Sequence, residues 1–310
     1  MIVSIIILSW NTKRLLKDCL KSIYSLDPKP YSLELIVVDN GSTDGSPEMV
    51  KKEFKEAKLI QNKRNLGFAK GNNQGIKAAR GDLIMLLNSD TVVHKGSIKK
   101  LAGATKDGPL QAVSPLLILP DKKPQIDYYM KFPNLWQICL YHNPVLRPLA
   151  LKIPLVRDLI CFSPKKRTFG VDQLPGAALM ASRETWDKVG LLDEDYHFLY
   201  EDVDWCYRAK KLGVKLKVIP EAKITHIGGA SWKKKLKEES FDFYQQYFSS
   251  LLLFVEKNYG QGKKLIFRVA LIKNWLLSSV LILPVAIFSP KAWKVVLDKL
   301  KLIRYFLIVK

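Results

Sequence analysis

The sequence predicts an α/β protein whose mostly parallel, doubly wound sheet is flanked by helices. Short apolar runs, typical of strands buried on both faces, alternate with segments whose apolar residues recur at helical spacing. Two of these runs stop abruptly at a polar cluster that carries a carboxylate, Asp39 in one case and Asp90 in the other. Ligands of open α/β sheets bind at the carboxyl ends of the strands, so these clusters mark a candidate site.

The first ninety residues alternate strand and helix. Strands are expected at residues 2–8, 33–38, 58–60 and 83–87, and helices over 15–24, from 46, and over 68–79. The second helix has a favoured start, with Ser46 as N-cap and Pro47 at the first helical position. This βαβαβαβ order predicts parallel strands joined by helical crossovers.

The middle of the chain, residues 109–167, is expected to be an irregular insertion on the acceptor side of the site, because it is rich in proline and aromatic residues. Its segment 146–160 mixes aliphatic residues with cations, which suits either a membrane surface or packing on the domain. Beyond it we expect a strand at 176–181, a helix from 182, a helix ending at 213, and a strand at 214–218 stopped by Pro220.

The C-terminal region, residues 236–310, is expected to form helices that associate with a membrane. Residues 274–289 are almost all apolar, but this stretch of 16 is shorter than the ~20 residues of a spanning helix. The chain has 50 Lys and Arg against 29 Asp and Glu, a net charge of +21 that favours an anionic partner. A helical cap or an oligomer interface is the alternative.

The four cysteines form no CxxC pair, which argues against a zinc site or a disulfide framework and fits a reducing cytosol.

Several polar segments have the residue types that a phosphorylated ligand needs. Asp39 opens a loop rich in hydroxyls and amides that suits a nucleobase or ribose, although GxGxxG and P-loop motifs are absent. Residues 65–75 place glycines and amides at a helix entrance, which suits a phosphate or, alternatively, close helix packing. Asp90 could meet a hard cation, or it could only cap a turn.

Three acidic residues, Glu201, Asp202 and Asp204, enter a predicted helix directly after an aromatic loop. Carboxylates complement the helix dipole at such a position, but the semi-apolar loop favours a general base beside an acceptor pocket. His226 precedes two glycines and is a candidate metal or phosphate ligand, although a lone histidine more often serves as an ordinary hydrogen-bonding residue.

In this order, the segments resemble the family 2 glycosyltransferases of the GT-A fold, particularly their rhamnosyltransferase-like branch. The resemblance is carried by Asp39, Asn65-Leu66-Gly67-Phe68, Leu86-Leu87-Asn88-Ser89-Asp90, Pro175-Gly176-Ala177, Glu201-Asp202-Val203-Asp204 and His226-Ile227-Gly228-Gly229. It covers roughly residues 1–232 and implies a GT-A catalytic domain over 1–235. It also implies inverting transfer of a sugar, rhamnose in that branch, from a nucleotide-diphosphate sugar.

The resemblance also implies residue roles. Asp202 is the expected base, with Glu201 beside it, and Asp90 and His226 are the expected ligands of Mg²⁺ or Mn²⁺. Asn88 stands where the family's DXD motif begins with Asp, so it would offer a carbonyl oxygen without charge. The donor nucleotide is expected to contact Ser9, Trp10, Asn11, Asp39, Arg64, Asn65, Gly67, Asn88 and Ser89, and the acceptor Tyr200, Trp205 and Trp232.

The expected partners are a nucleotide-diphosphate sugar, a glycan or polyprenyl-diphosphate-linked acceptor, and the anionic inner face of the cell membrane, reached from the cytoplasm. A homo-oligomer is compatible with the sequence. Nucleic acid is not expected, because carboxylates at three element ends would repel its phosphates. Two alternatives stay open. A sugar nucleotidyltransferase lacks support, because no glycine-rich basic loop follows the first strand, and a non-catalytic membrane-binding protein is allowed by the charge.

Overall fold

A computed structural model describes residues 1–27, 29–106, 108, 110–197, 199–228 and 240–308, and the chain divides into two compact units. The first unit comprises Met1–Met130 and Ser163–Trp232, and the second Lys131–Phe162 and Lys233–Lys310. Residues 131–162 therefore group with the C-terminal helices, whereas the sequence assigned the whole of 109–167 to the catalytic domain. One reason is a buried contact in the second unit, where Asn143 Nδ2 donates to Asn274 Oδ1 at 2.9 Å.

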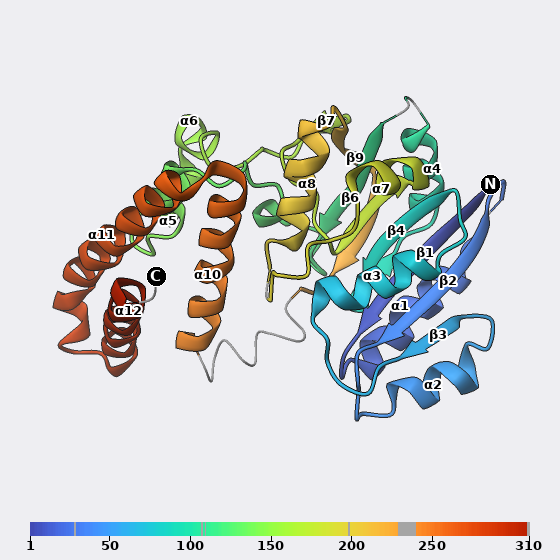
Figure 1. The fold of residues 1–310 in the computed structure, drawn as a ribbon, viewed down its shortest axis with the longest axis horizontal. Helices are drawn as coiled ribbons and strands as arrows, with labels where there is room; N and C mark the ends of the chain where they lie inside the picture. The colour runs from blue at the N-terminus through green and yellow to red at the C-terminus, as the bar shows by residue number, and fades with distance from the viewer. Residues whose placement is uncertain (28, 107, 109, 198, 229–239, 309–310) are drawn as a thin grey trace. The chain divides into compact units, whose positions relative to one another are not determined.

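Within its described residues, the first unit has one nine-stranded sheet with the order β3-β2-β1-β4-β8-β6-β9-β5, and β7 also pairs with β9 (Figure 1). The strands are β1 (Ile2–Ser9), β2 (Ser32–Asp39), β3 (Lys58–Gln61), β4 (Leu83–Asn88), β5 (Thr91–Val93), β6 (Gln111–Ile118), β7 (Phe169–Gly170), β8 (Ala178–Ser182) and β9 (Lys215–His226). The prediction that the first four strands are parallel is confirmed, since β1 pairs in parallel with β2 and β4, and β2 pairs in parallel with β3. The sheet is nevertheless mixed, because β8 runs antiparallel to β4 and β6.

Helices cover both faces of this sheet. They are α1 (Lys13–Tyr24), α2 (Ser46–Glu53), α3 (Phe68–Ala78), α4 (Ser97–Thr105), α7 (Arg183–Val189) and α8 (Glu201–Lys211). Residues on one face of β1 share a core with α1, α2 and α4, whereas Ile6 and Leu8 face α3. A Cβ at Gly75 would lie 2.3 Å from Ile6 Cγ2, and one at Gly71 would lie 2.4 Å from Leu8 Cδ1. These two glycines of α3 therefore serve close packing on the sheet, which was one of the two predicted roles.

Two strands differ from the sequence prediction. β6 is buried along its whole length, yet it lies where an irregular insertion was expected. β9 continues past Pro220, which was expected to stop it. The β6–β9 pairing shifts register, with Pro115 opposite Ile219 and Leu116 opposite Lys223. The residues between Ile219 and Lys223 form a bulge that accommodates the proline, so the strand resumes and ends at His226.

The second unit is helical. It contains η2, a π-helical turn (Gln137–Tyr141), and the helices α5 (Arg147–Lys152), α6 (Pro154–Arg157), α10 (Ser240–Tyr259), α11 (Gln261–Ala286) and α12 (Pro290–Ile308). Of the helices that the structure describes, α11 alone is long and apolar enough to cross a membrane, and 33% of its apolar window is buried in the protein. Residues 274–286 of the predicted apolar stretch are thus part of a 26-residue helix that passes through Pro284, and residues 287–289 follow its end.

Candidate active site

The carboxyl ends of β1, β2 and β4 bring predicted donor-binding residues side by side. Ser9 pairs with Asp39 across β1 and β2, and β4 pairs with β1 as far as Asn88. Hydroxyl groups cross the same edge, since Ser9 Oγ lies 2.9 Å from Thr12 Oγ1, which lies 2.9 Å from Ser89 Oγ. The strand register therefore builds one polar edge from residues far apart in the sequence.

Asp39 presents an unsatisfied oxygen at this edge. The residue is 1% exposed, and its Oδ2 accepts from the Ser42 N–H at 2.9 Å. Its Oδ1 is buried without a hydrogen-bond partner in the structure. A buried carboxylate oxygen that lacks a donor is costly, so Oδ1 is suited to receive a donor from a ligand.

The loop after β1 is fixed to the loop after β2. Asn11 has a φ of 52°; its N–H donates to Ser42 Oγ at 2.9 Å, and its Oδ1 accepts from the Thr43 N–H at 2.8 Å. The side chain of Asn11 is thus occupied in holding the loops together. The preceding Trp10 is 42% exposed, which leaves its ring available to a ligand.

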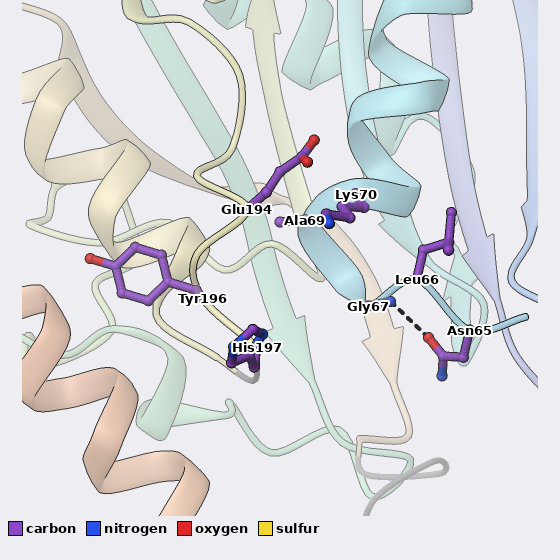
Figure 2. Close-up of a pocket in the computed structure, with 8 residues that line it drawn as sticks. All are labelled: Asn65, Leu66, Gly67, Ala69, Lys70, Glu194, Tyr196 and His197. Carbon is purple, nitrogen blue, oxygen red and sulfur yellow. Dashed lines mark hydrogen bonds between the residues drawn. The ribbon is translucent and has the colours of Figure 1, made fainter. Parts of the chain in front are cut away.

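Asn40, which the sequence did not single out, holds the loop before α3. It is 2% exposed; its Nδ2 donates to Asn65 Oδ1 at 2.9 Å, and its Oδ1 accepts from the Leu66 N–H at 3.1 Å. Asn65 Oδ1 also accepts from the Gly67 N–H (Figure 2). Arg64 is exposed, and its backbone lies against Gly41, where a Cβ would be 2.6 Å from Arg64 Cα. These contacts place the predicted donor loop beside the strand edge.

A cavity of about 260 Å³ opens between this loop and residues 194–197. Figure 2 shows its lining side chains, which are Asn65, Leu66, Gly67, Ala69, Lys70, Glu194, Tyr196 and His197. Its far wall is held by α3, because Asn73 Nδ2 donates to Glu194 Oε1 at 2.9 Å. The Tyr196 hydroxyl donates to Asp204 Oδ1 at 3.3 Å, and Asp204 forms an ion pair with Arg208 at 2.7 Å. Asp204 is therefore structural.

The predicted metal residues meet across the sheet. His226 Nε2 lies 3.2 Å from Asp90 Oδ1 and 3.4 Å from Asn88 Nδ2, and both predicted metal ligands are buried. No group of three or more His, Cys, Asp or Glu side chains that could hold a metal occurs among the described residues. The side chains that meet here are one carboxylate, one imidazole and one side-chain amide, whose Nδ2 faces His226.

Asp202 is held next to this edge by a short backbone segment. The Gly176 N–H donates to Asp202 Oδ2 at 2.7 Å, and the following carbonyl, of Ala177, accepts from the Asn88 N–H at 3.0 Å. A Cβ on Gly176 would lie 3.3 Å from Asp202 Cβ and 3.1 Å from the Phe68 ring, so a larger residue here would push these neighbours by a few tenths of an ångström. The motif Pro175-Gly176-Ala177 therefore links the predicted base to the end of β4.

The turn into α8 is strained. Leu199 and Tyr200 both lie in the left-handed region, with φ of 61° and 76°. Asp202 follows at the first turn of the helix, where its Oδ1 accepts from the Val203 N–H at 2.9 Å. Burial raises the pKa of Asp202, and its two N–H donors oppose that rise because they stabilise the anion.

Glu201 differs from its neighbour. It is 3% exposed, and its Oε2 has no hydrogen-bond partner in the structure. Burial first, and then the negative charge of Asp202, raise the pKa of Glu201 to about 8. Two carboxyl groups this close and this buried resist ionising together, so the pair keeps a proton above the ordinary carboxyl range.

Replacing Glu201 with Gln should flatten the pH dependence of stability. The native state binds the extra proton between pH 4.5 and about 8, so the free energy of unfolding falls as pH rises through this window. From pH 5.5 to 8.0 we expect Glu201→Gln to lose less stability than the wild type, by roughly 2 kcal/mol. Urea denaturation followed by tryptophan fluorescence at several pH values measures this, and an equal loss of stability in the two proteins would contradict it.

The predicted acceptor residues need correction. Trp205 is fully buried; its Nε1 donates to the Gly190 carbonyl at 2.9 Å, and its ring centroid lies 4.5 Å from that of Trp186. Tyr200 is 7% exposed. In this structure Trp205 therefore has no exposed face on which an acceptor could stack, and Tyr200 has little exposed surface. The third predicted residue, Trp232, lies outside the described residues.

Two further residues, Gln125 and Tyr128, reach the site from the segment after β6, which the sequence marked only as irregular. The Tyr128 ring contacts His226 edge to face, at 5.2 Å between centroids. Burial raises the pKa of Tyr128, and the charges of Asp90 and Asp202 add to the shift. The Tyr128 hydroxyl therefore feels the charges of both Asp90, a predicted metal ligand, and Asp202, the predicted base.

Comparison with known proteins gives a family. Residues 4–149 match the model described as "Glycosyl transferase family 2". The chain is 26% identical over 209 residues to the dTDP-rhamnosyl transferase RfbF of Shigella flexneri. This alignment covers 66% of the chain and 64% of RfbF. It is 27% identical over 226 residues to the N-acetylglucosaminyl-diphospho-decaprenol L-rhamnosyltransferase of Mycobacterium tuberculosis, which covers 68% of this chain and 71% of that relative. The chain thus spans less than two thirds of RfbF.

Solved structures give the fold. GalNAc-T7, crystallised with UDP, GalNAc and Mn²⁺, aligns with a TM-score of 0.58 and 19% identity over 72% of this chain and 43% of that chain. The mannosyltransferase PcManGT of Pyrobaculum calidifontis, in complex with GDP-Man and Mn²⁺, aligns with a TM-score of 0.56 and 15% identity over 97% of this chain and 84% of that chain. The predicted GT-A fold is confirmed.

Proposed function

Because this chain belongs to glycosyltransferase family 2, we propose that it transfers a sugar, with inversion, from a nucleotide-diphosphate sugar to a lipid-linked or cell-surface glycan. Rhamnose is the proposed sugar and an N-acetylglucosaminyl-diphospho-polyprenol the proposed acceptor, in keeping with the named relatives. The observation that carries the proposal is the placement of Asp202 beside Asn88, through Gly176 and Ala177. The proposed base and the polar strand edge thus lie next to each other.

The proposed chemistry is a single in-line displacement. An acceptor hydroxyl loses its proton to Asp202 while its oxygen forms a bond to the anomeric carbon. The bond from that carbon to the diphosphate breaks, and its electron pair leaves with the nucleoside diphosphate. Asp39 Oδ1 would accept a hydrogen bond from the nucleoside, and Trp10 would pack on it. Arg64 and the loop before α3 would bind the diphosphate.

The residues at the β4 edge fit a divalent cation. Asp90 and His226 are an oxygen and nitrogen pair that suits Mn²⁺ or Mg²⁺. Asn88 turns its Nδ2 toward His226 in this structure, so its side-chain oxygen would join the pair only after the amide group rotates. When bound, the cation would neutralise charge that develops on the departing diphosphate. The protein supplies only one carboxylate, so affinity for the cation should rise when the diphosphate is present.

A donor screen tests this function. The protein is incubated with a panel of nucleotide sugars, dTDP-rhamnose first, with Mn²⁺ or EDTA and an N-acetylglucosaminyl-diphospho-polyprenol. Release of nucleoside diphosphate that depends on both acceptor and cation is the expected result. Release of pyrophosphate would instead indicate a sugar nucleotidyltransferase, and no turnover of any donor would overturn the proposal.

The second unit is proposed to bind the anionic cytoplasmic face of the membrane. Large apolar side chains of α11, α12 and their connection are exposed, among them Val280 at 66%, Ile287 at 68% and Phe288 at 87%. The two helices carry four and five basic residues and a single acidic one, Asp298. Such a surface repels a second copy of itself but complements anionic lipid, which favours a bilayer over a homo-oligomer.

Vesicle sedimentation tests the membrane proposal. We expect wild-type protein to bind vesicles that contain anionic lipid at least about tenfold more tightly than neutral vesicles, and weakly at high salt. The double substitution Ile287→Ser and Phe288→Ser should lower binding to anionic vesicles because it removes apolar area at the turn. Exchange of Tyr24, an exposed aromatic of α1, for Ser is the control. Concentration-dependent dimers without vesicle binding would favour the oligomer interface instead.

A further inference from the structure

We propose that Gln125 is a positioning residue that fixes the tautomer of His226, so that the Nε2 lone pair of the imidazole faces Asp90 and Asn88. The inference deepens the proposed function and rests on it for the role of His226 as a cation ligand. Gln125 lies outside the strand-end motifs, in the segment between β6 and η1 (Ile126–Tyr128). It is 8% exposed and makes two contacts with the same histidine.

The first contact orients the carboxamide. Gln125 Nε2 donates to the His226 backbone carbonyl at 2.7 Å. A carbonyl oxygen only accepts, so the amino end of the carboxamide must be the end that faces it. The amide group of Gln125 therefore has one orientation, with its Oε1 turned toward the imidazole.

The second contact assigns the ring proton. Gln125 Oε1 lies 3.0 Å from His226 Nδ1. An amide oxygen is only an acceptor, so Nδ1 must carry the hydrogen. In the neutral ring Nε2 then holds a lone pair, and Nε2 lies 3.2 Å from Asp90 Oδ1. A lone pair and a carboxylate oxygen at this distance repel each other unless a positive charge, such as a divalent cation, lies with them.

Gly228, Tyr128 and Asn88 pack around the Gln125 carboxamide and the His226 ring. Gly228 has a φ of +69°, and a Cβ there would lie 3.4 Å from Gln125 Nε2 and 3.8 Å from the His226 ring. Tyr128 packs its ring edge to face on His226, and Asn88 Nδ2 lies 3.4 Å from His226 Nε2. The positive φ of Gly228 favours glycine at this place in the His226-Ile227-Gly228-Gly229 motif, and a Cβ there would be within van der Waals reach of the carboxamide.

Two variants and a control separate positioning from structure. Gln125→Met keeps the length but removes both hydrogen bonds, whereas Gln125→Glu keeps an acceptor for Nδ1. Gln137→Met is the control, because Gln137 is also buried and donates to a backbone carbonyl, that of Lys131, at 2.7 Å. The full chain, labelled with ¹⁵N-histidine, is studied by long-range ¹H–¹⁵N NMR at alkaline pH, and Mn²⁺ affinity is measured by EPR. The chain has four histidines, and the signal of His226 is assigned by its loss in His226→Gln.

We expect wild type and Gln125→Glu to show the Nδ1–H tautomer of His226. Gln125→Met should lose that preference and bind Mn²⁺ 10–100-fold more weakly. Unchanged tautomer and Mn²⁺ affinity in Gln125→Met, or an Nε2–H tautomer in the wild type, would overturn the inference even if donor turnover is normal. Gln125-dependent Mn²⁺ binding without turnover of any nucleotide sugar would instead overturn the proposed function.

Discussion

Asp202→Asn should lower kcat for sugar transfer by about 10²–10⁴-fold with little change in the KM of the donor. The amide cannot accept the proton of the acceptor hydroxyl, whereas its size is that of the carboxylate. Each oxygen of Asp202 accepts one backbone N–H, from Gly176 and from Val203, so the side chain is held at one place. Asparagine keeps one of these hydrogen bonds through its oxygen, which should keep the turn into α8 in place.

The control for this substitution is Asp172→Asn. Asp172 forms a salt bridge of 2.6 Å with Lys210, a partly exposed residue of α8, the helix that carries Asp202. Loss of this salt bridge should leave kcat unchanged, because exposed ion pairs contribute little. Release of nucleoside diphosphate at saturating donor and acceptor measures kcat, and circular dichroism checks the fold. Because burial raises the pKa of Asp202, the acid limb of the wild-type pH profile should lie above the ordinary carboxyl range. A kcat within threefold of wild type would remove Asp202 as the base.

The N-terminal half of the sheet could be predicted because local signals agree there. Each strand from β1 to β4 is a short apolar run, and each helix between them has apolar residues at helical spacing. β6 and the second part of β9 could not be predicted, because the proline-rich residues 109–167 were expected to be irregular and Pro220 was expected to stop the strand. The register shift that accommodates Pro115 and Pro220 depends on the pairing of two strands about a hundred residues apart. No local pattern contains that information.

The same distinction applies to the site. Asp39, Asp90 and Asp202 stood out because each is a carboxylate at the end of an expected element. Trp205 was predicted to contact the acceptor, but it is fully buried in the structure. The sequence alone does not tell which side of α8 faces the core. Gln125 and Asn40 were missed because their importance comes from partners distant in the chain, His226 and Asn65. Motif reading identifies groups that carry charge, whereas the groups that orient them become visible only in the fold.

Asp90→Ala should abolish cation-dependent transfer and weaken Mn²⁺ binding at least about 100-fold. Asp90 is the single carboxylate of the β4 edge, and Asn88 beside it contributes no charge. Without Asp90, the proposed site keeps only an imidazole and an amide, a set that binds Mn²⁺ weakly. The substitution also removes the carboxylate that lies 3.2 Å from His226 Nε2, so Asp90→Asn, which preserves the size of the side chain, is measured in parallel.

Asn88→Asp provides the opposite test at the same edge. A second carboxylate should tighten Mn²⁺ binding in EPR titrations, because it adds a negative charge next to Asp90 and His226. The double variant Asn88→Asp, Asp90→Asn moves the single carboxylate by two residues. It should recover only part of the Mn²⁺ affinity that Asp90→Asn loses, because β4 ends at Asn88 and the chain turns before Asp90. If Asp90→Ala and Asp90→Asn both retain wild-type Mn²⁺ affinity and transfer, the cation does not bind at the end of β4. His226 and Gln125 would then hold a structural contact between β9 and the segment after β6.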